Sequence, residues 1–123
     1  MPEDKYAYFT AKCEKNYKNK EIIGYAACYP NGDHLFSSKL YVRKEHRGKG
    51  IARGFLGEMI ALCRLEYGLD KIRLMVSKQN KDAIAAYHKM GFETIEPVKV
   101  DIGGGFFMDD YLMELKIDKI LEG

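Results

Sequence analysis

The sequence predicts an α/β fold of the α+β type, in which a mixed, mostly antiparallel sheet carries two main helices. Strand-like runs separated by polar turns fill the opening third, residues 5–43. The hydrophobic period changes to that of a helix at Gly50 and back to that of a strand at Lys71. Strand, helix and strand in succession form a right-handed crossover between parallel strands, whereas the remaining connections favour antiparallel pairs.

The opening third predicts an antiparallel meander of three strands. Residues 5–12 are aromatic and strand-like, and the polar segment 14–21 predicts a turn. The apolar run 22–29 is typical of a strand with both faces covered. Pro-Asn-Gly-Asp at 30–33 predicts a tight turn, because proline fixes φ and Asn-Gly tolerates positive φ. A third strand is expected over 34–43.

The middle of the chain predicts a helix that leads into a strand. From Gly50 to Tyr67, apolar residues recur at helical spacing and form one broad apolar face. Gly68 is expected to end this helix, because the residue after a helix commonly adopts the left-handed backbone conformation that glycine allows. Residues 71–76 alternate between apolar and polar side chains, which indicates a strand.

The last third predicts a second helix and two strands. Asn80 can cap a helix over 81–90, with an acidic residue in its first turn and a glycine after its end. A strand is expected from 92 to 100, followed by a glycine-rich loop over 101–105. A final strand is expected over 111–117.

Length and composition predict one domain, residues 1–123, with a buried core. The chain is 46% hydrophobic and 31% charged, which excludes a disordered tail. The net charge of 20 − 18 = +2 is too balanced for a protein that mainly neutralises DNA phosphates. We therefore expect no nucleic-acid partner.

The cysteines and the apolar runs predict a cytoplasmic location and no membrane partner. Cys13, Cys28 and Cys63 are odd in number and lack C-x-x-C spacing, so free thiols in a reducing compartment are expected. The first residues lack the pattern of a signal peptide, and no apolar run is long enough to span a bilayer. The three histidines show no metal-ligand spacing, and no metal is expected.

A basic, glycine-containing stretch lies between the third predicted strand and the first predicted helix. Gly48 and Gly50 let the backbone approach a ligand, and the first turn of a helix has unpaired N–H groups. A phosphate or pyrophosphate suits such a place. The stretch matches neither a P-loop, because Arg43 stands at the required glycine, nor a dinucleotide fingerprint, because Arg53 replaces the third glycine.

Two motifs resemble those of the GNAT superfamily of N-acetyltransferases. Arg47-x-x-Gly50-x-Ala52, between a strand and a helix, is similar to that family's acyl-CoA signature. The stretch VSKQNKDAIAAYHKMGFE at 76–93 resembles its next motif, and the likeness covers roughly residues 5–117. The resemblance implies the acyl-CoA N-acyltransferase fold, in which the parallel strand pair splays apart.

The resemblance also implies acetyl-CoA as the acyl donor and assigns residues to it. Backbone amides would hold the pyrophosphate at Arg47, Gly48, Lys49, Gly50, Ile51 and Ala52. The pantetheine arm would pair with the strand residues Leu40, Tyr41 and Val42. Asn80 matches a cofactor contact, and Tyr87 matches the acid that protonates the departing thiolate. Without the motif, Tyr87 reads as a core residue and Asn80 as a helix cap.

The implied reaction is direct attack of a primary amine of a small molecule or peptide on the thioester in a ternary complex. By family analogy the backbone N–H of Val42 would polarise the carbonyl. Asp109 and Asp110 precede the last predicted strand, near where the family admits its acceptor. They could bind an ammonium group or shuttle its proton, and two solvated turn aspartates are an equally good interpretation.

The sequence departs from the family at its start, where the usual first strand and acceptor-side helices have no counterpart. The acceptor cleft would then lack one wall, and an apolar sheet edge would be exposed. A homodimer, or pairing with another chain, could cover that edge; a truncated reading frame is the other explanation. The alternative function is a non-catalytic acyl-CoA-binding module or subunit of a larger acetyltransferase assembly.

Overall fold

The computed structural model describes residues 7–16 and 19–117, which form a mixed six-stranded sheet with two helices. The strand order is β1-β2-β3-β4-β6-β5. The strands are β1 (Ala7–Asn16), β2 (Asn19–Asn31), β3 (His34–Val42), β4 (Lys71–Ser77), β5 (Glu93–Gly103) and β6 (Phe106–Lys116). The helices are α1 (Ile51–Ala61) and α2 (Lys81–Lys89), with shorter helical turns η2 (Lys44–His46) and η3 (Leu62–Glu66). The predicted fold class is confirmed.

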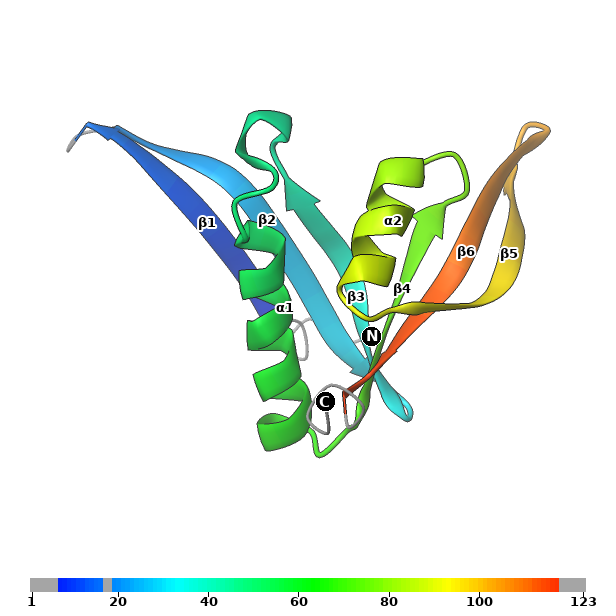
Figure 1. The fold of residues 1–123 in the computed structure, drawn as a ribbon. Coiled ribbons are helices and arrows are strands. Elements are labelled where there is room, and N and C mark those ends of the chain that lie inside the picture. The colour runs from blue at the N-terminus through cyan, green and yellow to red at the C-terminus, as the bar shows by residue number, and fades with distance from the viewer. Residues whose placement is uncertain (1–6, 17–18, 118–123) are drawn as a thin grey trace.

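Within residues 7–16 and 19–117, only one pair of neighbouring strands is parallel, and the two strands separate along their length. β3 pairs with β4 through three residue pairs, of which Ser37 with Leu74 is the last. The other neighbouring strands are antiparallel. Beyond Ser37 the two strands diverge, and Figure 1 shows the gap between β3 and β4 widening upward behind α2. The expected splay therefore lies at the C-terminal ends of β3 and β4.

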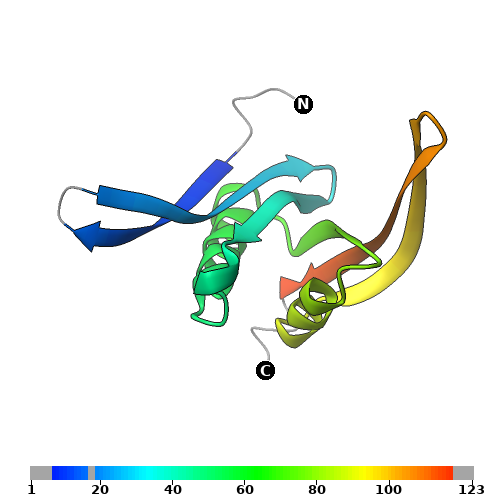
Figure 2. The ribbon, with the colours of Figure 1, turned by 90° about the horizontal axis from the view of Figure 1, so that it is seen from above.

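Both helices cover the same face of the sheet, as the view from above shows (Figure 2). Phe55 and Met59 of α1, which lies mainly over β2 and β3, belong to one buried core cluster with Leu74 of β4 and Met113 of β6. The partly buried Tyr87 of α2 joins the same cluster. Because side chains alternate along a strand, residues flanking these core positions point to the opposite face, which we call the helix-free face.

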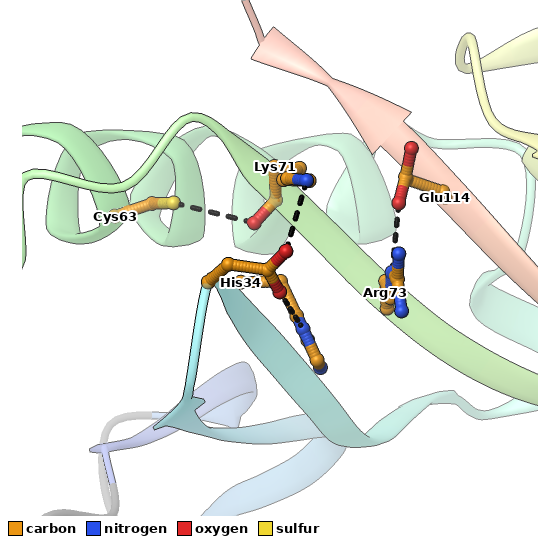
Figure 3. A network of polar contacts seen from close by, with 6 residues as sticks. His34, Cys63, Lys71, Arg73 and Glu114 are labelled. Carbon is orange, nitrogen blue, oxygen red and sulfur yellow. Dashed lines mark hydrogen bonds and ion pairs between the residues drawn. The ribbon is translucent and has the colours of Figure 1, made fainter.

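The helix-free face carries polar and aromatic side chains. Arg73 of β4 donates from Nε to Oε2 of Glu114 on β6 at 2.7 Å, and Glu114 is only 6% exposed (Figure 3). On β2 and β3 the rings of Tyr25 and Tyr41 lie 5.3 Å apart and remain partly exposed. This face therefore offers both a buried ion pair and an exposed aromatic pair.

Four strand boundaries differ from the sequence prediction, at the end of β1, the start of β2, the end of β5 and the start of β6, because pairing extends these strands into polar or glycine-rich segments. The segment 14–21 was expected to be a turn, yet Asn16 pairs with Asn19 and both flanking strands continue. The loop expected over 101–105 shrinks to a tight turn, because β5 runs to Gly103. Ladder hydrogen bonds between neighbouring strands outweigh local propensity in these segments.

Local signals placed the start of α2 and the left-handed glycine after the first helical segment correctly. The Asn80 side chain accepts a hydrogen bond from the Ala83 amide at 3.2 Å, which caps α2 as expected. Gly68 adopts φ of 62° after the first helix. That helix is shorter than the predicted 50–67, because its last turn over Leu62–Glu66 widens to π geometry.

Replacing Gly24 by alanine should destabilise the fold by about 1–3 kcal/mol. A Cβ on Gly24 would lie 2.9 Å from the Tyr41 carbonyl oxygen and 3.3 Å from the Phe55 ring. Chemical denaturation measures the change in the free energy of unfolding. As a control, Gly57→Ala in the exposed middle of α1 meets nothing within 4 Å and should stabilise by about 0.5–1 kcal/mol. Equal effects of the two substitutions would contradict the packing argument.

Candidate functional site

A cleft of about 530 Å³ lies between α1 and α2, where β3 and β4 separate. From β3 it is lined by Leu40, Tyr41 and Val42. The following loop and α1 contribute Arg47, Gly48, Gly50, Ile51 and Ala52. Asn80 and Tyr87 line it from the α2 side. The structure thus brings together all the predicted cofactor residues except Lys49, which is exposed and does not line the cleft.

The N-terminus of α1 presents backbone amides to this cleft. Gly48 and Gly50 have φ of 79° and 85°, which glycine adopts without strain. The first helical hydrogen bond runs from the Gly54 amide to the Gly50 carbonyl at 3.0 Å, so the preceding helical amides lack a helical acceptor. No side chain caps this end, and its first turn has no acidic residue. The positive end of the helix dipole therefore faces open space that suits an anion.

The basic residues of the loop divide into two kinds. Arg43 forms ion pairs with Glu21 and with Glu45, the second at 2.9 Å. Arg47 donates from Nε to the Val42 carbonyl oxygen at 2.9 Å. This bond ties the glycine loop back to the end of β3, so the Arg47 side chain fixes the shape of the loop. Arg53 lines the cleft and leaves its positive charge near the helix N-terminus.

The end of β3 has free hydrogen-bonding positions on the side facing β4. β3 is paired with β2 on its other side, where Tyr41 pairs with Tyr25 and Val42 with Gly24. Toward β4 the ladder stops at Ser37, so the segment 40–42 lacks strand partners there. An extended amide-bearing ligand in the gap could pair with this backbone in the manner of an added strand.

The helix α2 contributes a tyrosine and small side chains. Ala83 and Ala86 line the cleft with short side chains, and Tyr87 lines it from the same face of α2. Tyr87 is half-buried, and its ring lies 5.7 Å from that of Phe92. Burial raises the pKa of the Tyr87 hydroxyl above its ordinary value of 10.0. The hydroxyl therefore stays protonated at neutral pH and can donate a proton.

The two aspartates expected before the last strand lie inside it, so their predicted position was wrong. Asp109 and Asp110 pair with Lys99 and Val98 of β5, because the β5–β6 hairpin is longer than the sequence indicates. Asp109 Oδ1 forms an ion pair with Lys78 Nζ at 2.8 Å. Asp110 is buried and points to the opposite face. The two carboxylates therefore do not act on one group.

Sequence reasoning missed several residues of the cleft wall. His46 and Arg53 flank the glycine loop, and Asp82, Lys89 and Met90 belong to α2 or its end. Helical periodicity was the available signal for Met90, because it lies three residues after Tyr87. His46 carried no such signal, because it lies in the three-residue turn η2 between β3 and α1, where no helical or strand periodicity applies.

Comparison with known proteins identifies the family. The model of the acetyltransferase (GNAT) family matches residues 2–92. The chain belongs to the GNAT family. It is 33% identical over 86 residues to the L-amino acid N-acetyltransferase AaaT of Escherichia coli K12, an alignment that covers 68% of this chain and 52% of AaaT. The chain thus spans about half the length of this relative.

Solved GNAT structures share the fold at lower identity. Nourseothricin acetyltransferase superposes with a TM-score of 0.80 at 24% identity, over 95% of this chain and 69% of that one. The PaiA N-acetyltransferase from Thermoplasma acidophilum, solved in complex with coenzyme A, gives a TM-score of 0.69 at 23% identity, over 91% and 61% of the two chains. These structures establish the GNAT fold of this chain. No helix in residues 7–16 and 19–117 is long and apolar enough to cross a membrane.

Proposed function

We propose that the protein transfers an acetyl group from acetyl-CoA to a primary amine of a small molecule or peptide. The observation that supports this proposal is the composition of a single cleft. It joins the open N-terminus of α1, the unpaired edge of β3 and the hydroxyl-bearing Tyr87. The helix N-terminus suits the pyrophosphate of the ligand, and the strand edge can pair with its pantetheine amides. The tyrosine hydroxyl can protonate the leaving thiolate.

The residues of the cleft fit acetyl-CoA in the following way. The amides at 50–53 and the Arg53 side chain would hold the pyrophosphate. The backbone of 40–42 would pair with the pantetheine arm, and Asn80 would contact it from the α2 side. Bound acetyl-CoA supplies a thioester whose carbonyl is open to attack. The Val42 N–H is the proposed donor to that carbonyl.

The proposed reaction is a direct attack in a ternary complex. The neutral amine nitrogen forms a bond to the carbonyl carbon, the carbon–sulfur bond breaks, and the sulfur leaves with the electron pair. The Tyr87 hydroxyl gives its proton to that sulfur, and the proton released by the amine passes to water. Much of the acceleration comes from holding the two reactants in one geometry.

A non-catalytic acyl-CoA-binding module is the second candidate. It is favoured by one observation: no helix in the described residues covers the helix-free face of the sheet (Figure 2). The test is release of free thiol from acetyl-CoA across a panel of amines, polyamines, amino acids and peptides. Release that depends on an amine supports the enzyme. Tight CoA binding without release from any member supports the module.

We also propose that a second copy of the chain covers the far end of the β5–β6 hairpin. The edge expected to be apolar was the one nearest the N-terminus, but most exposed apolar side chains lie on this hairpin, which Figure 1 shows extending from the body. They are Ile95, Val100, Ile102, Phe106, Phe107 and Met108. Because β5 is an edge strand, two copies can pair through it around a twofold axis.

Sedimentation analysis should show a dimer that becomes a monomer in the double variant Ile102→Lys, Phe106→Lys. The substitutions place two charges on the apolar hairpin, and burying them in a pairing surface is costly. The control is Leu65→Lys, which changes a still more exposed apolar residue elsewhere and should leave the dimer intact. A wild-type chain that stays monomeric at high concentration would refute the proposal.

We further propose a cytoplasmic location. Cys28 and Cys63 are free thiols in the described part of the chain, as expected in a reducing compartment. Burial raises the pKa of Cys28 to about 11 and also raises that of Cys63, which keeps both thiols protonated.

A further inference from the structure

The carbonyl of Val42, at the end of β3, is bound by the side chain of Arg47. Arg47 Nε donates to the Val42 carbonyl oxygen at 2.9 Å, and both residues line the cleft. A hydrogen bond from a charged donor is shorter and stronger than one between neutral groups, so it fixes the geometry of both partners. The glycine loop is thus bonded to the strand end with which the pantetheine arm is proposed to pair.

The hydrogen bonds between β2 and β3 show where the polar groups of Val42 point. The Arg43 amide donates to the Ile23 carbonyl of β2 at 2.7 Å. Val42, one residue earlier, lies opposite Gly24. In an antiparallel pair, the residue next to a hydrogen-bonded position directs both its N–H and its C=O away from the partner strand. Both groups of Val42 therefore point away from β2, toward the gap between β3 and β4.

Arg47 occupies only one of these two groups. The ladder between β3 and β4 ends at Ser37, so Val42 lies beyond the last strand pairing on this side. An unpaired strand edge presents both N–H donors and C=O acceptors. At Val42 the acceptor is already used by the guanidinium, and the donor remains directed into the gap. This position therefore suits a carbonyl oxygen of a ligand and not a ligand N–H.

The positive charge of Arg47 adds to this preference. The N–H and the C=O of one residue lie side by side on the same edge of a strand. The guanidinium that binds the Val42 carbonyl is therefore also close to any atom that binds the Val42 N–H. A thioester carbonyl oxygen gains negative charge when an amine attacks its carbon, and a fixed positive charge nearby stabilises it.

The loop that carries Arg47 is anchored by contacts within the chain. Arg43 forms ion pairs with Glu21 of β2 and with Glu45 of the turn η2. The Arg47 amide donates to the Lys44 carbonyl at 3.3 Å. These contacts hold Arg47 in place before a ligand binds, which lowers the entropic cost of binding.

We propose that Arg47 is a positioning residue for acyl transfer, whose guanidinium reserves the Val42 N–H for the carbonyl oxygen of the bound thioester. This inference rests on the proposed function, which assigns the Val42 N–H to that carbonyl. It goes beyond that function by giving the Arg47 side chain a role separate from the backbone contacts of the loop with pyrophosphate. Arg47 acts through Val42 and does not bind the acceptor amine.

Replacing Arg47 by methionine should lower kcat about tenfold or more and leave KM for acetyl-CoA within about threefold. Methionine keeps the aliphatic part of the side chain but cannot donate, so the freed Val42 carbonyl would repel the thioester oxygen. The matched control is Lys44→Met, which removes a positive charge from the same loop. Lys44 is exposed and does not line the cleft, so kcat should stay within about twofold. An unchanged kcat in Arg47→Met, or an equal loss in both variants, would overturn the proposal.

Nuclear magnetic resonance tests the same contact without turnover. With no amine present, acetyl-CoA should shift the Val42 amide resonance more than CoA does, because only acetyl-CoA brings a thioester carbonyl. The difference between the two ligands should disappear in Arg47→Met. The Gly50 amide, at the N-terminus of α1, should respond to both ligands in both proteins. A difference at Val42 that persists in Arg47→Met would overturn the positioning role.

Two further outcomes separate this inference from the proposed function. If the wild-type protein transfers acetyl to no amine but shows the Arg47-dependent difference at Val42, the proposed transfer fails and the positioning role stands. If Arg47→Met does not fold, the scalar coupling between Arg47 Nε and the Val42 carbonyl carbon decides in the wild-type protein. A coupling that persists with acetyl-CoA bound supports the proposal, and its absence overturns it.

Discussion

Replacing Tyr87 by phenylalanine should lower kcat about 100-fold or more and leave the affinity for CoA within about twofold. The substitution removes only the hydroxyl, and the ring contact with Phe92 that positions α2 is retained. Loss of the proton donor leaves the departing thiolate without an acid, so the chemical step slows while binding persists. Steady-state kinetics measure kcat, and calorimetry measures the dissociation constant of CoA.

The control for this substitution is Tyr67→Phe. Tyr67 is also partly buried with a raised pKa, but it lies at the far end of the first helix and does not line the cleft. The Tyr67→Phe substitution should leave kcat unchanged. If Tyr87→Phe turned over at the wild-type rate, Tyr87 would be only a core residue, which is the interpretation that its apolar neighbours favour.

The pH dependence of kcat should also reflect the role of Tyr87 as a proton donor. Tyr87 acts as a donor, so its contribution is present while the hydroxyl is protonated and is lost as pH rises through its pKa. Burial raises that pKa above 10.0, so Tyr87 should cause no fall in kcat between neutral pH and about pH 10. An alkaline limb that appeared near pH 8 and vanished in Tyr87→Phe would contradict this assignment.

Replacing Gly50 by valine should weaken CoA binding at least about tenfold, which corresponds to about 1.4 kcal/mol. Gly50 precedes α1 with φ of 85°, a conformation that a β-branched residue adopts only with strain. Relief of that strain would turn the amides of the first helical turn away from the cleft. Calorimetric titration with CoA measures the change in affinity.

Gly32→Val separates this local effect from general instability. Gly32 also has positive φ, 66°, but it lies in the turn between β2 and β3, away from the cleft. Both substitutions should lower the melting temperature, and only Gly50→Val should weaken CoA binding. A similar loss of affinity in the two variants would mean that the helix N-terminus does not hold the cofactor.

The sequence determined the parts of the site that depend on local backbone chemistry. Gly48 and Gly50 adopt positive φ before a helix, and Asn80 caps the next helix through a contact three residues away. Such features involve neighbours in the chain, so residue type and spacing are enough to predict them. The crossover between β3 and β4 followed from the order of the elements in the same way. The roles of these residues toward acetyl-CoA stay predictions.

Only the tertiary structure decided what depends on strand pairing. The sequence treated Asp109 and Asp110 as equivalent turn residues, but their pairing with β4 and β5 sends them to opposite faces. Asp109 forms an ion pair with Lys78, and Asp110 is a largely buried residue on the helix-free face. Likewise, the sequence assigned a role only to the Arg47 backbone amide, and the structure shows that its guanidinium donates to the Val42 carbonyl at the end of β3. The pairing register between strands distant in sequence decides which face each side chain occupies. A shift of one residue would move every side chain of the strand to the other face of the sheet.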